Sequence, residues 1–373
     1  MLVQSITLGN YRNYRDLKLE FHPNVNVLVG DNGQGKTNIL ESIFYEATGK
    51  SHRTNYDTEL IKWNEKYMRV SLKGKRKSGK FKVEIMVRSD GKKILKVNNQ
   101  MMKKLSELMG TLNVVLFSPE DMMLVKGGPA VRRRFLDIEI SQTSPFYCHN
   151  LTNYLKVLSQ RNNLLKAIRE KKQSSDLLDV WDMQLVEFGS KIIKKRVEVL
   201  EKLKLLAKEI HSRITDGKED LILSYQATVG PIKASVMTLE DYYLDKIKDN
   251  RLSEIKMGAT LIGPHRDDIE IKIGDNSVKA YGSQGQQRSC ALSLKLAEME
   301  LMKLETKECP ILLLDDVLSE LDPVRRKILL EIVRGSVQTF VTATDIDFFS
   351  ESLLSGSRIF RVNDGQIKIL QEG

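Results

Sequence analysis

The stretch Gly30-Asp31-Asn32-Gly33-Gln34-Gly35-Lys36-Thr37 decides how this 373-residue chain folds. It fits the pattern G-x-x-x-x-G-K-S/T of a phosphate-binding loop. The apolar, β-branched run at 24–29 predicts a buried strand before it, and 38–45 has the apolar spacing of a helix after it. A chance glycine turn before a helix is the alternative, but all the fixed positions and both flanks are present. The sequence therefore predicts a binding site for a nucleoside triphosphate.

The residue types in this loop suit phosphate chemistry. The glycines let successive backbone N–H groups turn toward phosphate oxygens, and the helix N-terminus adds partial positive charge. Lys36 can reach the β- and γ-phosphates, and the Thr37 hydroxyl can ligate Mg²⁺. The nucleotide-binding candidates in the loop are Gly30, Asp31, Asn32, Gly33, Gln34, Gly35, Lys36 and Thr37.

A second part of the site is predicted near the end of the chain. Residues 310–316 form an apolar run that ends in Asp315 and Asp316. A carboxylate at the carboxyl end of a buried parallel strand beside a phosphate loop holds Mg²⁺, which makes Asp315 the second metal candidate beside Thr37. Asp316 can orient or deprotonate the attacking water, so we expect it to be catalytic together with Lys36.

Composition limits the class of protein. The hydrophobic share of 41% and the charged share of 29% are typical of a globular protein, and no apolar run has the length of a membrane span. The start of the chain lacks a secretion signal, and Cys148, Cys290 and Cys309 lack zinc-binding spacing. We therefore expect a cytoplasmic protein with no membrane partner. The net charge of +10 favours a polyanionic partner.

Positive charge is concentrated at 61–104, where fifteen Lys or Arg residues face three acids. The segment predicts β-hairpins, because Phe81 and Val83 alternate with Lys80 and Lys82. A solvated loop is the alternative, but the density of charge favours a surface for nucleic-acid phosphates, without a motif for reading bases. The DNA-binding candidates are Lys73, Lys75, Arg76, Lys77, Lys80 and Lys82.

Near the N-terminus, 2–8 and 16–21 predict two strands around a turn at 10–15 that is rich in arginine and tyrosine. Such a turn could stack on a base or pair with phosphate, so Arg12 is a further nucleotide-binding candidate. An exposed polar turn is equally compatible with the spacing.

From 118–121, which has the composition of a helix start, the chain is helical to about residue 212. Apolar residues at three-and-four spacing, among them Leu151, Leu155 and Leu158, predict a helical hairpin. Arg132-Arg133-Arg134 is expected on an exposed, salt-bridged helix surface, with phosphate contact as the alternative. The polar stretch 263–268 fits either a metal or acid–base site or a turn between strands.

Upstream of the acidic strand, Ser283-Gln284-Gly285-Gln286-Gln287 resembles the signature motif of ABC-type ATPases, and Ser319-Glu320-Leu321-Asp322 resembles their D-loop. A helical insertion separates the phosphate loop from the signature, as in SMC-like ATPases, but it is too short for their long coiled coils. This arrangement resembles the RecF family. The stretches that carry the resemblance span nearly the full chain and are 10–14, 30–37, 117–121, 133–137, 263–268 and 283–288.

The resemblance implies an α/β fold. An ABC-type (SMC-like) ATPase head with mixed β-sheets would be built from 1–118 and 259–373, and 119–258 would form an inserted all-helical arm domain. ATP and Mg²⁺ would be the cofactors. Ser283, Gly285 and Gln286 would contact the γ-phosphate held by a second copy, so ATP would drive formation of a homodimer and Ser283 would be catalytic.

The same resemblance implies a DNA-binding switch in recombinational repair, replication restart and the SOS response to DNA damage. The ATP-bound dimer would bind DNA, either single-stranded or at a single-strand/duplex junction. With RecR and RecO as partners, it would promote loading of RecA.

Two departures from the ABC-type pattern predict slow turnover. Asp316 stands where such heads carry a longer Glu, and a switch histidine is absent near Thr344 and Asp345. We therefore expect a weak, DNA-dependent ATPase that acts as a timer. An energising subunit of a transporter and a small-molecule kinase are the alternatives. The long insertion and the basic segment argue against the first, and the signature argues against the second.

Overall fold

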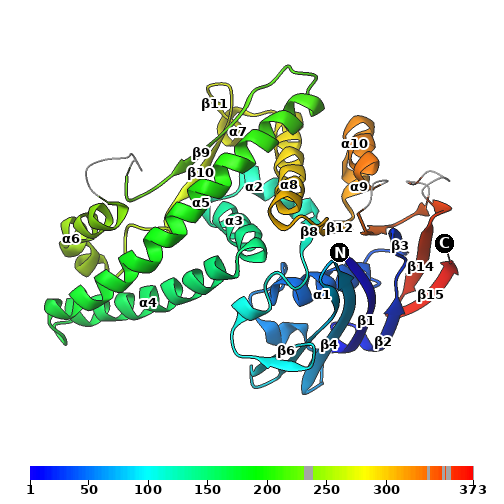
Figure 1. Ribbon diagram of the computed structural model, residues 1–373, viewed down its shortest axis with the longest axis horizontal. Helices are drawn as coiled ribbons and strands as arrows, with labels where there is room; N and C mark the ends of the chain where they lie inside the picture. Colours follow the sequence, from blue (N-terminus) through cyan, green and yellow to red (C-terminus); the bar gives the residue numbers. More distant parts are fainter. Residues whose placement is uncertain (231–237, 334–336, 347–348, 350–353, 373) are drawn as a thin grey trace. The chain divides into compact units, whose positions relative to one another are not determined.

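The computed structural model describes residues 1–230, 238–333, 337–346, 349 and 354–372. The chain divides into two compact units, which Figure 1 shows coloured along the sequence. The head unit comprises Met1–Asp121, Arg213–Thr215 and Ala291–Gly373. The arm unit comprises Met122–Ser212 and Asp216–Cys290. No helix in the described part of the chain combines the length and the apolar surface that a bilayer crossing needs.

The second boundary of this division differs from the predicted one, which lay between residues 258 and 259. The strand β9 (Leu221–Gln226) pairs antiparallel with β10 (Asp268–Ile273) along its whole length, from Leu221↔Ile273 to Gln226↔Asp268. This pairing keeps the segment up to Cys290 with the arm unit. The arm unit therefore holds a sheet of order β11-β10-β9 beside its helices, which the prediction of an all-helical insert left out.

The head unit contains a mixed sheet of order β15-β14-β3-β13-β12-β8 and an antiparallel sheet of order β2-β1-β4-β5-β6-β7. The strands of the mixed sheet are β3 (Val25–Val29), β8 (Val114–Phe117), β12 (Ile311–Asp315), β13 (Thr339–Ala343), β14 (Ser357–Asn363) and β15 (Gln366–Gln371). Those of the antiparallel sheet are β1 (Leu2–Tyr11), β2 (Tyr14–Glu20), β4 (Tyr67–Arg76), β5 (Gly79–Arg88), β6 (Lys93–Val97) and β7 (Gln100–Met102). The helices are α1 (Lys36–Thr48), α9 (Val317–Glu320) and α10 (Pro323–Val333).

Parallel pairing in the mixed sheet explains the apolar runs of the sequence. β3, β12 and β13 are buried at every residue, as expected for strands covered on both faces. β14 is parallel to β3 and β15 closes the edge antiparallel to β14, so both ends of the chain meet in one sheet. In Figure 1 the blue β3 lies beside the red β14, and β15 lies on the other side of β14 at the edge of the sheet.

The antiparallel sheet has one buried and one exposed face. Phe81, Val83, Ile85 and Val87 of β5 are buried, as predicted, while the residues between them are at least partly exposed. The predicted strands at 2–8 and 16–21 are present as β1 and β2, with a turn at Arg12 and Asn13. Arg12 has a positive φ of 52°, so this turn is tight.

The arm unit is mainly helical. Its helices are α2 (Met122–Lys126), α3 (Pro129–Thr143), α4 (Pro145–Arg169), α5 (Leu178–Ile214), α6 (Leu239–Met257) and α7 (Val278–Tyr281), and β11 (Asn276–Ser277) pairs with β10. α5 ends with two residues assigned to the head unit. α8 (Gln284–Thr306) begins in the arm unit and continues in the head unit. The predicted helical hairpin is present as α4 and α5.

The buried face of α4 differs from the predicted apolar stripe. Leu155 is 46% exposed, whereas Tyr154 and Arg161 are buried on a face shared with Val157 and Leu165. Arg161 donates to Asp182 of α5 and to Glu254 of α6, each at 2.6 Å. The prediction was wrong here because apolar spacing cannot detect a helix whose buried face is polar and ion-paired.

Candidate functional site

The predicted phosphate loop lies between β3 and α1, as the motif requires. Gly30 has a φ of 153°, and a Cβ atom at this position would collide with the carbonyl oxygen of Val362 in β14. Gly35 has a φ of 114°, and its Cβ would lie 2.6 Å from Asn13 Nδ2. Glycine is therefore required at both positions by conformation and by space.

Segments from both ends of the chain hold the loop in place. Asn13 Nδ2 donates to the Gln34 carbonyl at 3.1 Å, and the Tyr14 hydroxyl donates to the Gly35 carbonyl at 3.0 Å. From the β14–β15 turn, the Asp364 N–H donates to Gln34 Oε1 at 2.6 Å. The tip of the loop, Asp31 to Gly33, is exposed. The loop is thus pre-organised before any ligand arrives, by contacts that the sequence analysis missed.

Lys36, the first residue of α1, turns back into the loop. Its ammonium donates to the carbonyls of Gly30 at 2.5 Å and Asp31 at 2.8 Å. Burial lowers the pKa of Lys36, and the carboxylates of Asp316 and Asp315 oppose this effect. The cation and both predicted acids therefore lie within one electrostatic neighbourhood.

Asp315 ends β12, and its side chain meets the first turn of α1. Thr37 Oγ1 and Thr342 Oγ1 both donate to Asp315 Oδ1 at 2.8 Å. Burial raises the pKa of Asp315, against the effect of these two hydrogen bonds. No Lys, Arg or His of the described residues forms an ion pair with this carboxylate. A buried carboxylate beside a hydroxyl, without a cationic partner, is a donor set that suits Mg²⁺.

Asp316 lies one residue beyond the strand, in the left-handed conformation with a φ of 53°. Its N–H donates to Thr342 Oγ1 at 2.9 Å, and Ser319 Oγ lies 3.1 Å from Asp316 Oδ1. Thr342 of β13 therefore contacts both acids, a role that the sequence analysis did not assign to it.

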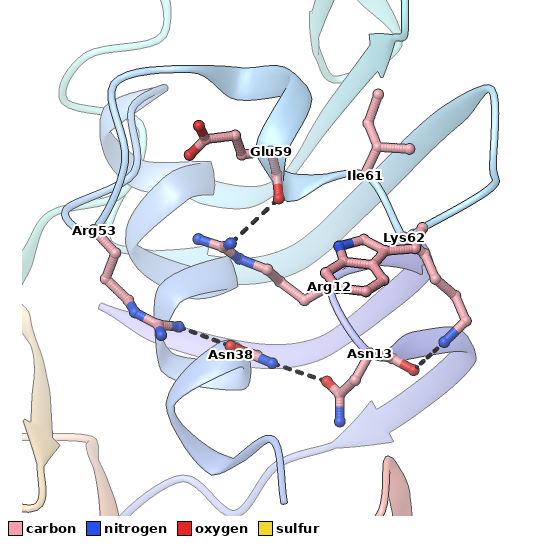
Figure 2. Close-up of a pocket in the computed structure, with 8 residues that line it drawn as sticks. Arg12, Asn13, Asn38, Arg53, Glu59, Ile61 and Lys62 are labelled. Carbon is pink, nitrogen blue, oxygen red and sulfur yellow. Dashed lines mark hydrogen bonds between the residues drawn. The ribbon is translucent and has the colours of Figure 1, made fainter. Parts of the chain in front are cut away.

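An open pocket of about 500 Å³ adjoins the loop (Figure 2). Its lining residues are Arg12, Asn13, Asn38, Arg53, Glu59, Ile61, Lys62 and Trp63. Arg53 Nη1 donates to Asn38 Oδ1 at 2.9 Å, and Asn38 Nδ2 donates to Asn13 Oδ1 at 2.8 Å. Since Asn13 also holds the Gln34 carbonyl, this chain of hydrogen bonds joins the pocket wall to the phosphate loop.

Arg12 lines the pocket, but its guanidinium is already paired. Its Nε and Nη2 donate to the two carboxylate oxygens of Glu41 at 2.9 and 2.7 Å. Although burial acts to raise the pKa of Glu41, hydrogen bonds from Arg12 and Ser51 and the charges of Arg12 and Arg53 hold it below its ordinary value. Arg12 thus presents the outer edge of a fixed ion pair rather than a free cation.

The predicted signature residues belong to the arm unit, where α8 begins. Gln286 N–H donates to Ser283 Oγ at 3.2 Å, and Ser283 N–H donates to Gln286 Oε1 at 2.9 Å, which is a capping box. Gln286 Nε2 also donates to Glu219 Oε1 at 3.1 Å, and the other Glu219 oxygen lies 3.1 Å from His211 Nε2. Ser283 and Gly285 are exposed. The motif is therefore a rigid helix N-terminus that another molecule can reach.

The basic candidates fall into two groups. Lys73 and Lys75 of β4 stand directly opposite Lys82 and Lys80 of β5, and Lys73, Lys75 and Lys80 are exposed. Like charges in directly opposed pairs repel and destabilise a sheet. Glu84 pairs with Lys82 at 3.3 Å but leaves this row with excess positive charge. We call these four lysines the lysine row.

Arg76 is the last residue of β4, and Lys77 lies in the turn that follows it, beyond the lysine row. Arg76 Nη1 donates to the Gly110 carbonyl, and Lys77 Nζ donates to the Lys307 carbonyl, each at 2.6 Å. Both cations therefore already donate hydrogen bonds to backbone carbonyls of the protein. The sequence pattern did not distinguish these two residues from the lysine row.

The expected exposed arginine surface is instead partly buried. Arg132 forms a two-bond pair with Asp268 at 2.7 and 2.8 Å, and Arg133 Nη1 donates to the Asp267 carbonyl at 2.6 Å. Only Arg134 of the three is exposed. The prediction was wrong for Arg132 because its acidic partner is more than a hundred residues away in sequence.

The polar stretch 263–268 is used for structure in the arm unit. His265 Nδ1 accepts from the Tyr154 hydroxyl at 2.7 Å, its Nε2 donates to the Thr260 carbonyl at 3.1 Å, and burial lowers its pKa to about 4. Among the described residues, no group of three or more His, Cys, Asp or Glu side chains is placed to hold a metal ion. Of the two alternatives, the turn between strands is the one that these contacts support.

Comparisons with known proteins agree on one family. The family model described as RecF/RecN/SMC N terminal domain matches residues 2–368. The DNA replication and repair protein RecF of Bacillus cytotoxicus is 46% identical over 368 residues, which is 98% of each chain.

Solved structures give the same result. The structure of the recombination mediator protein RecF-ATP in the RecFOR pathway is 36% identical, covers 99% of this chain and 98% of its own, and has a TM-score of 0.92. The Smc head domain of Pyrococcus furiosus, with a TM-score of 0.55 and 19% identity over 99% of this chain and 96% of its own, shares the fold. This chain belongs to the RecF family of DNA replication and repair proteins.

Proposed function

We propose that this protein is an ATP-dependent DNA-binding switch of recombinational repair and replication restart. The observation that carries the proposal is the hydrogen bond between Thr37 and Asp315, because it joins the phosphate loop and the acidic strand in one site. The relative described as RecF-ATP binds ATP in a fold that superimposes on nearly the whole chain. ATP is therefore the nucleotide that we assign to the loop.

Within this site the chain supplies distinct functions. The backbone of the loop and Lys36 bind the phosphates, as the glycine conformations and the buried ammonium allow. Thr37 and Asp315 hold Mg²⁺, which neutralises charge on the β- and γ-phosphates when it is bound. Asp316 is the residue that we assign to orient or deprotonate water. Its short side chain supports slow hydrolysis, and we propose that DNA stimulates it.

We further propose that ATP joins two copies through the exposed signature. Ser283 and the N-terminus of α8 would face the γ-phosphate held by the other copy. An anion at a helix N-terminus is stabilised by unpaired N–H groups and by the helix dipole. The capping box and the Glu219 contact support this role because they hold the motif rigid without using its exposed surface.

The lysine row is the DNA surface that we propose. Cross-strand lysine pairs raise the energy of the free protein, and phosphates would relieve that repulsion. Dimerisation would place two such surfaces on one complex. RecR and RecO are the proposed protein partners, with loading of RecA in the cytoplasm as the outcome, since the similar solved protein is a mediator in the RecFOR pathway. Membership of a family of DNA replication and repair proteins argues against the alternative function as a transporter subunit.

Sedimentation velocity tests the proposal. Wild type, Lys36→Arg and Ser283→Arg are compared with and without ATP, Mg²⁺ and DNA. We expect ATP to shift wild type from monomer to dimer. Ser283→Arg should bind ATP but stay monomeric, and Lys36→Arg should lose the response to ATP. Leu304→Arg is the matched control, because Leu304 is 63% exposed on the same helix but lies outside the signature. Normal dimerisation of Ser283→Arg would refute the contact in trans.

A further inference from the structure

A buried histidine of α5 is connected to the signature through one carboxylate. His211 lies in the last turn of α5, and its side chain is fully buried. Its Nε2 lies 3.1 Å from Glu219 Oε2, while Glu219 Oε1 accepts from Gln286 Nε2 at 3.1 Å. Because a carboxylate can only accept hydrogen bonds, His211 Nε2 carries the hydrogen and donates it. The two oxygens of Glu219 therefore join α5 to the first turn of α8.

The backbone on both sides of Glu219 fixes the place of this carboxylate. Before it, Gly217 has a positive φ of 71°, and its N–H donates to the Ser212 carbonyl of α5 at 2.8 Å. After it, the Gly274 N–H donates to the Asp220 carbonyl at 2.9 Å, directly beside the pairing of β9 with β10. The side chain of Glu219 is only 21% exposed. It is thus held between a helix and a sheet rather than on a free loop.

The helix that carries His211 is itself fixed within the arm unit. Near its beginning, the buried Asp182 accepts from Arg161 of α4 and from Arg251 of α6, each at 2.6 Å. α5 is one continuous helix of 37 residues between these ion pairs and its last turn. His211 therefore presents its Nε2 from an element whose position is set by the other helices of the arm unit.

We propose that His211 and Glu219 are positioning residues for the signature, and that α5 sets the place of Gln286 through them. This inference rests on the proposed contact between the signature of one copy and the ATP held by the other. Gln286 accepts from the Ser283 N–H, so the capping box forms only while the Gln286 side chain keeps its place. The phosphate loop belongs to the head unit and the two positioning residues to the arm unit. They therefore act on dimerisation rather than on the affinity of a monomer for ATP.

Asparagine and glutamine at position 211 form a matched pair for the test. Both are neutral and polar, but only glutamine is long enough to place an N–H near the position of His211 Nε2. Sedimentation velocity with Mg²⁺-ATP measures the dissociation constant of the dimer. We expect His211→Asn to raise it about threefold for each of the two signatures of a symmetric dimer, about tenfold in all, equivalent to ~1.4 kcal/mol. His211→Gln should restore most of the dimerisation, which a requirement for the imidazole ring alone would not allow.

Two further variants separate positioning from a general effect on the arm unit. Glu219→Ala, at a partly exposed position, should weaken dimerisation at least as much, and it carries the test if His211→Asn does not fold. Adding His211→Asn to Glu219→Ala should have no further effect, because both residues act through Gln286. Lys208→Ala is the matched control on α5, because it removes an exposed ion pair with Asp220 at 2.8 Å and leaves Glu219 in place. It should dimerise like wild type.

The ATP affinity of the phosphate loop is measured separately, by calorimetry in the Ser283→Arg background, which we expect to be monomeric. There, His211→Asn should leave the affinity unchanged. Three results would overturn the positioning role: wild-type dimerisation of His211→Asn or Glu219→Ala, additive losses in the double variant, or a loss of ATP affinity in the monomeric background. If wild type did not dimerise with ATP, the proposed contact in trans would itself be refuted, and the inference with it.

Discussion

Replacing Asp315 by asparagine should stabilise the free head unit while weakening its hold on Mg²⁺-ATP. The side chain is buried, and the hydrogen bonds from Thr37 and Thr342 both go to Oδ1. Asparagine has an oxygen that can accept the same two bonds. It removes the buried negative charge, which is the group that we propose binds the metal.

The gain in stability follows from the raised pKa of Asp315. A carboxyl with a raised folded-state pKa favours folding only while it is protonated, and that contribution is lost as the pH rises through the folded pKa. The advantage of Asp315→Asn should therefore be largest at neutral pH and shrink on acidification. Single stabilising substitutions commonly contribute ~0.5–2 kcal/mol. For a unit of this size, each kcal/mol raises Tm by about 2–4 °C.

The stability that bound Mg²⁺-ATP adds to each variant follows from its affinity and concentration. With ATP at about 100 times Kd, wild type gains ~2.7 kcal/mol of stability. If losing the carboxylate weakens Mg²⁺-ATP binding about 100-fold, the same concentration equals the new Kd and stabilises by only ~0.4 kcal/mol. The shift in Tm caused by Mg²⁺-ATP should fall accordingly, from several degrees to about one.

Thermal unfolding at neutral pH, with no ligand, with ATP and EDTA, and with Mg²⁺-ATP, measures both effects. Asp316→Asn is the matched control, because it changes the neighbouring acid and leaves the Thr37–Asp315 hydrogen bond in place. It should keep the Mg²⁺-ATP shift and lose hydrolysis. A full wild-type shift in Asp315→Asn, or a lower Tm of its free form, would refute the reasoning.

Three further predictions follow from other parts of the molecule. The double variant Lys75→Glu, Lys80→Glu should bind DNA more weakly, with the slope of log affinity against log salt reduced by about two in fluorescence anisotropy; an unchanged slope would exclude the lysine row from the interface. Glu219→Gln should leave ATP binding intact but weaken ATP-dependent dimerisation, measured by sedimentation velocity, because Gln286 loses a charged hydrogen-bond acceptor. Dimerisation as strong as in wild type would contradict this role of Glu219. Arg161→Met should lower the free energy of unfolding of the arm unit by ~3–5 kcal/mol, followed through Trp181 emission in urea, since two carboxylates lose their buried partner; a loss under ~1 kcal/mol would contradict that account.

Much of the head unit could be predicted because its signals are local. The glycines of the phosphate loop, the apolar run before Asp315 and the alternation in β5 each act within a few residues, through backbone conformation and burial of neighbouring side chains. In the arm unit, the capping pair Ser283 and Gln286 is also three residues apart. Such patterns can be recognised in one dimension because the physical contacts that produce them lie within one turn or one strand.

The partners of the polar groups were decided only by the tertiary structure. Thr37 and Asp315 are 278 residues apart, and nothing in either segment identifies Thr342 as the second donor. Trp63 is an ordinary turn residue in the sequence and becomes part of a pocket only when Arg12 and Asn38 approach it.

The same limit explains the errors in the arm unit. Apolar spacing placed Leu155 in the core and could not detect Arg161, whose burial depends on acids from two other helices. Pairing of β9 with β10 likewise moved the domain boundary, because a strand signal does not say which strand lies beside it. Local chemistry determined the motifs of this protein, and long-range pairing of charges and strands decided how they are assembled.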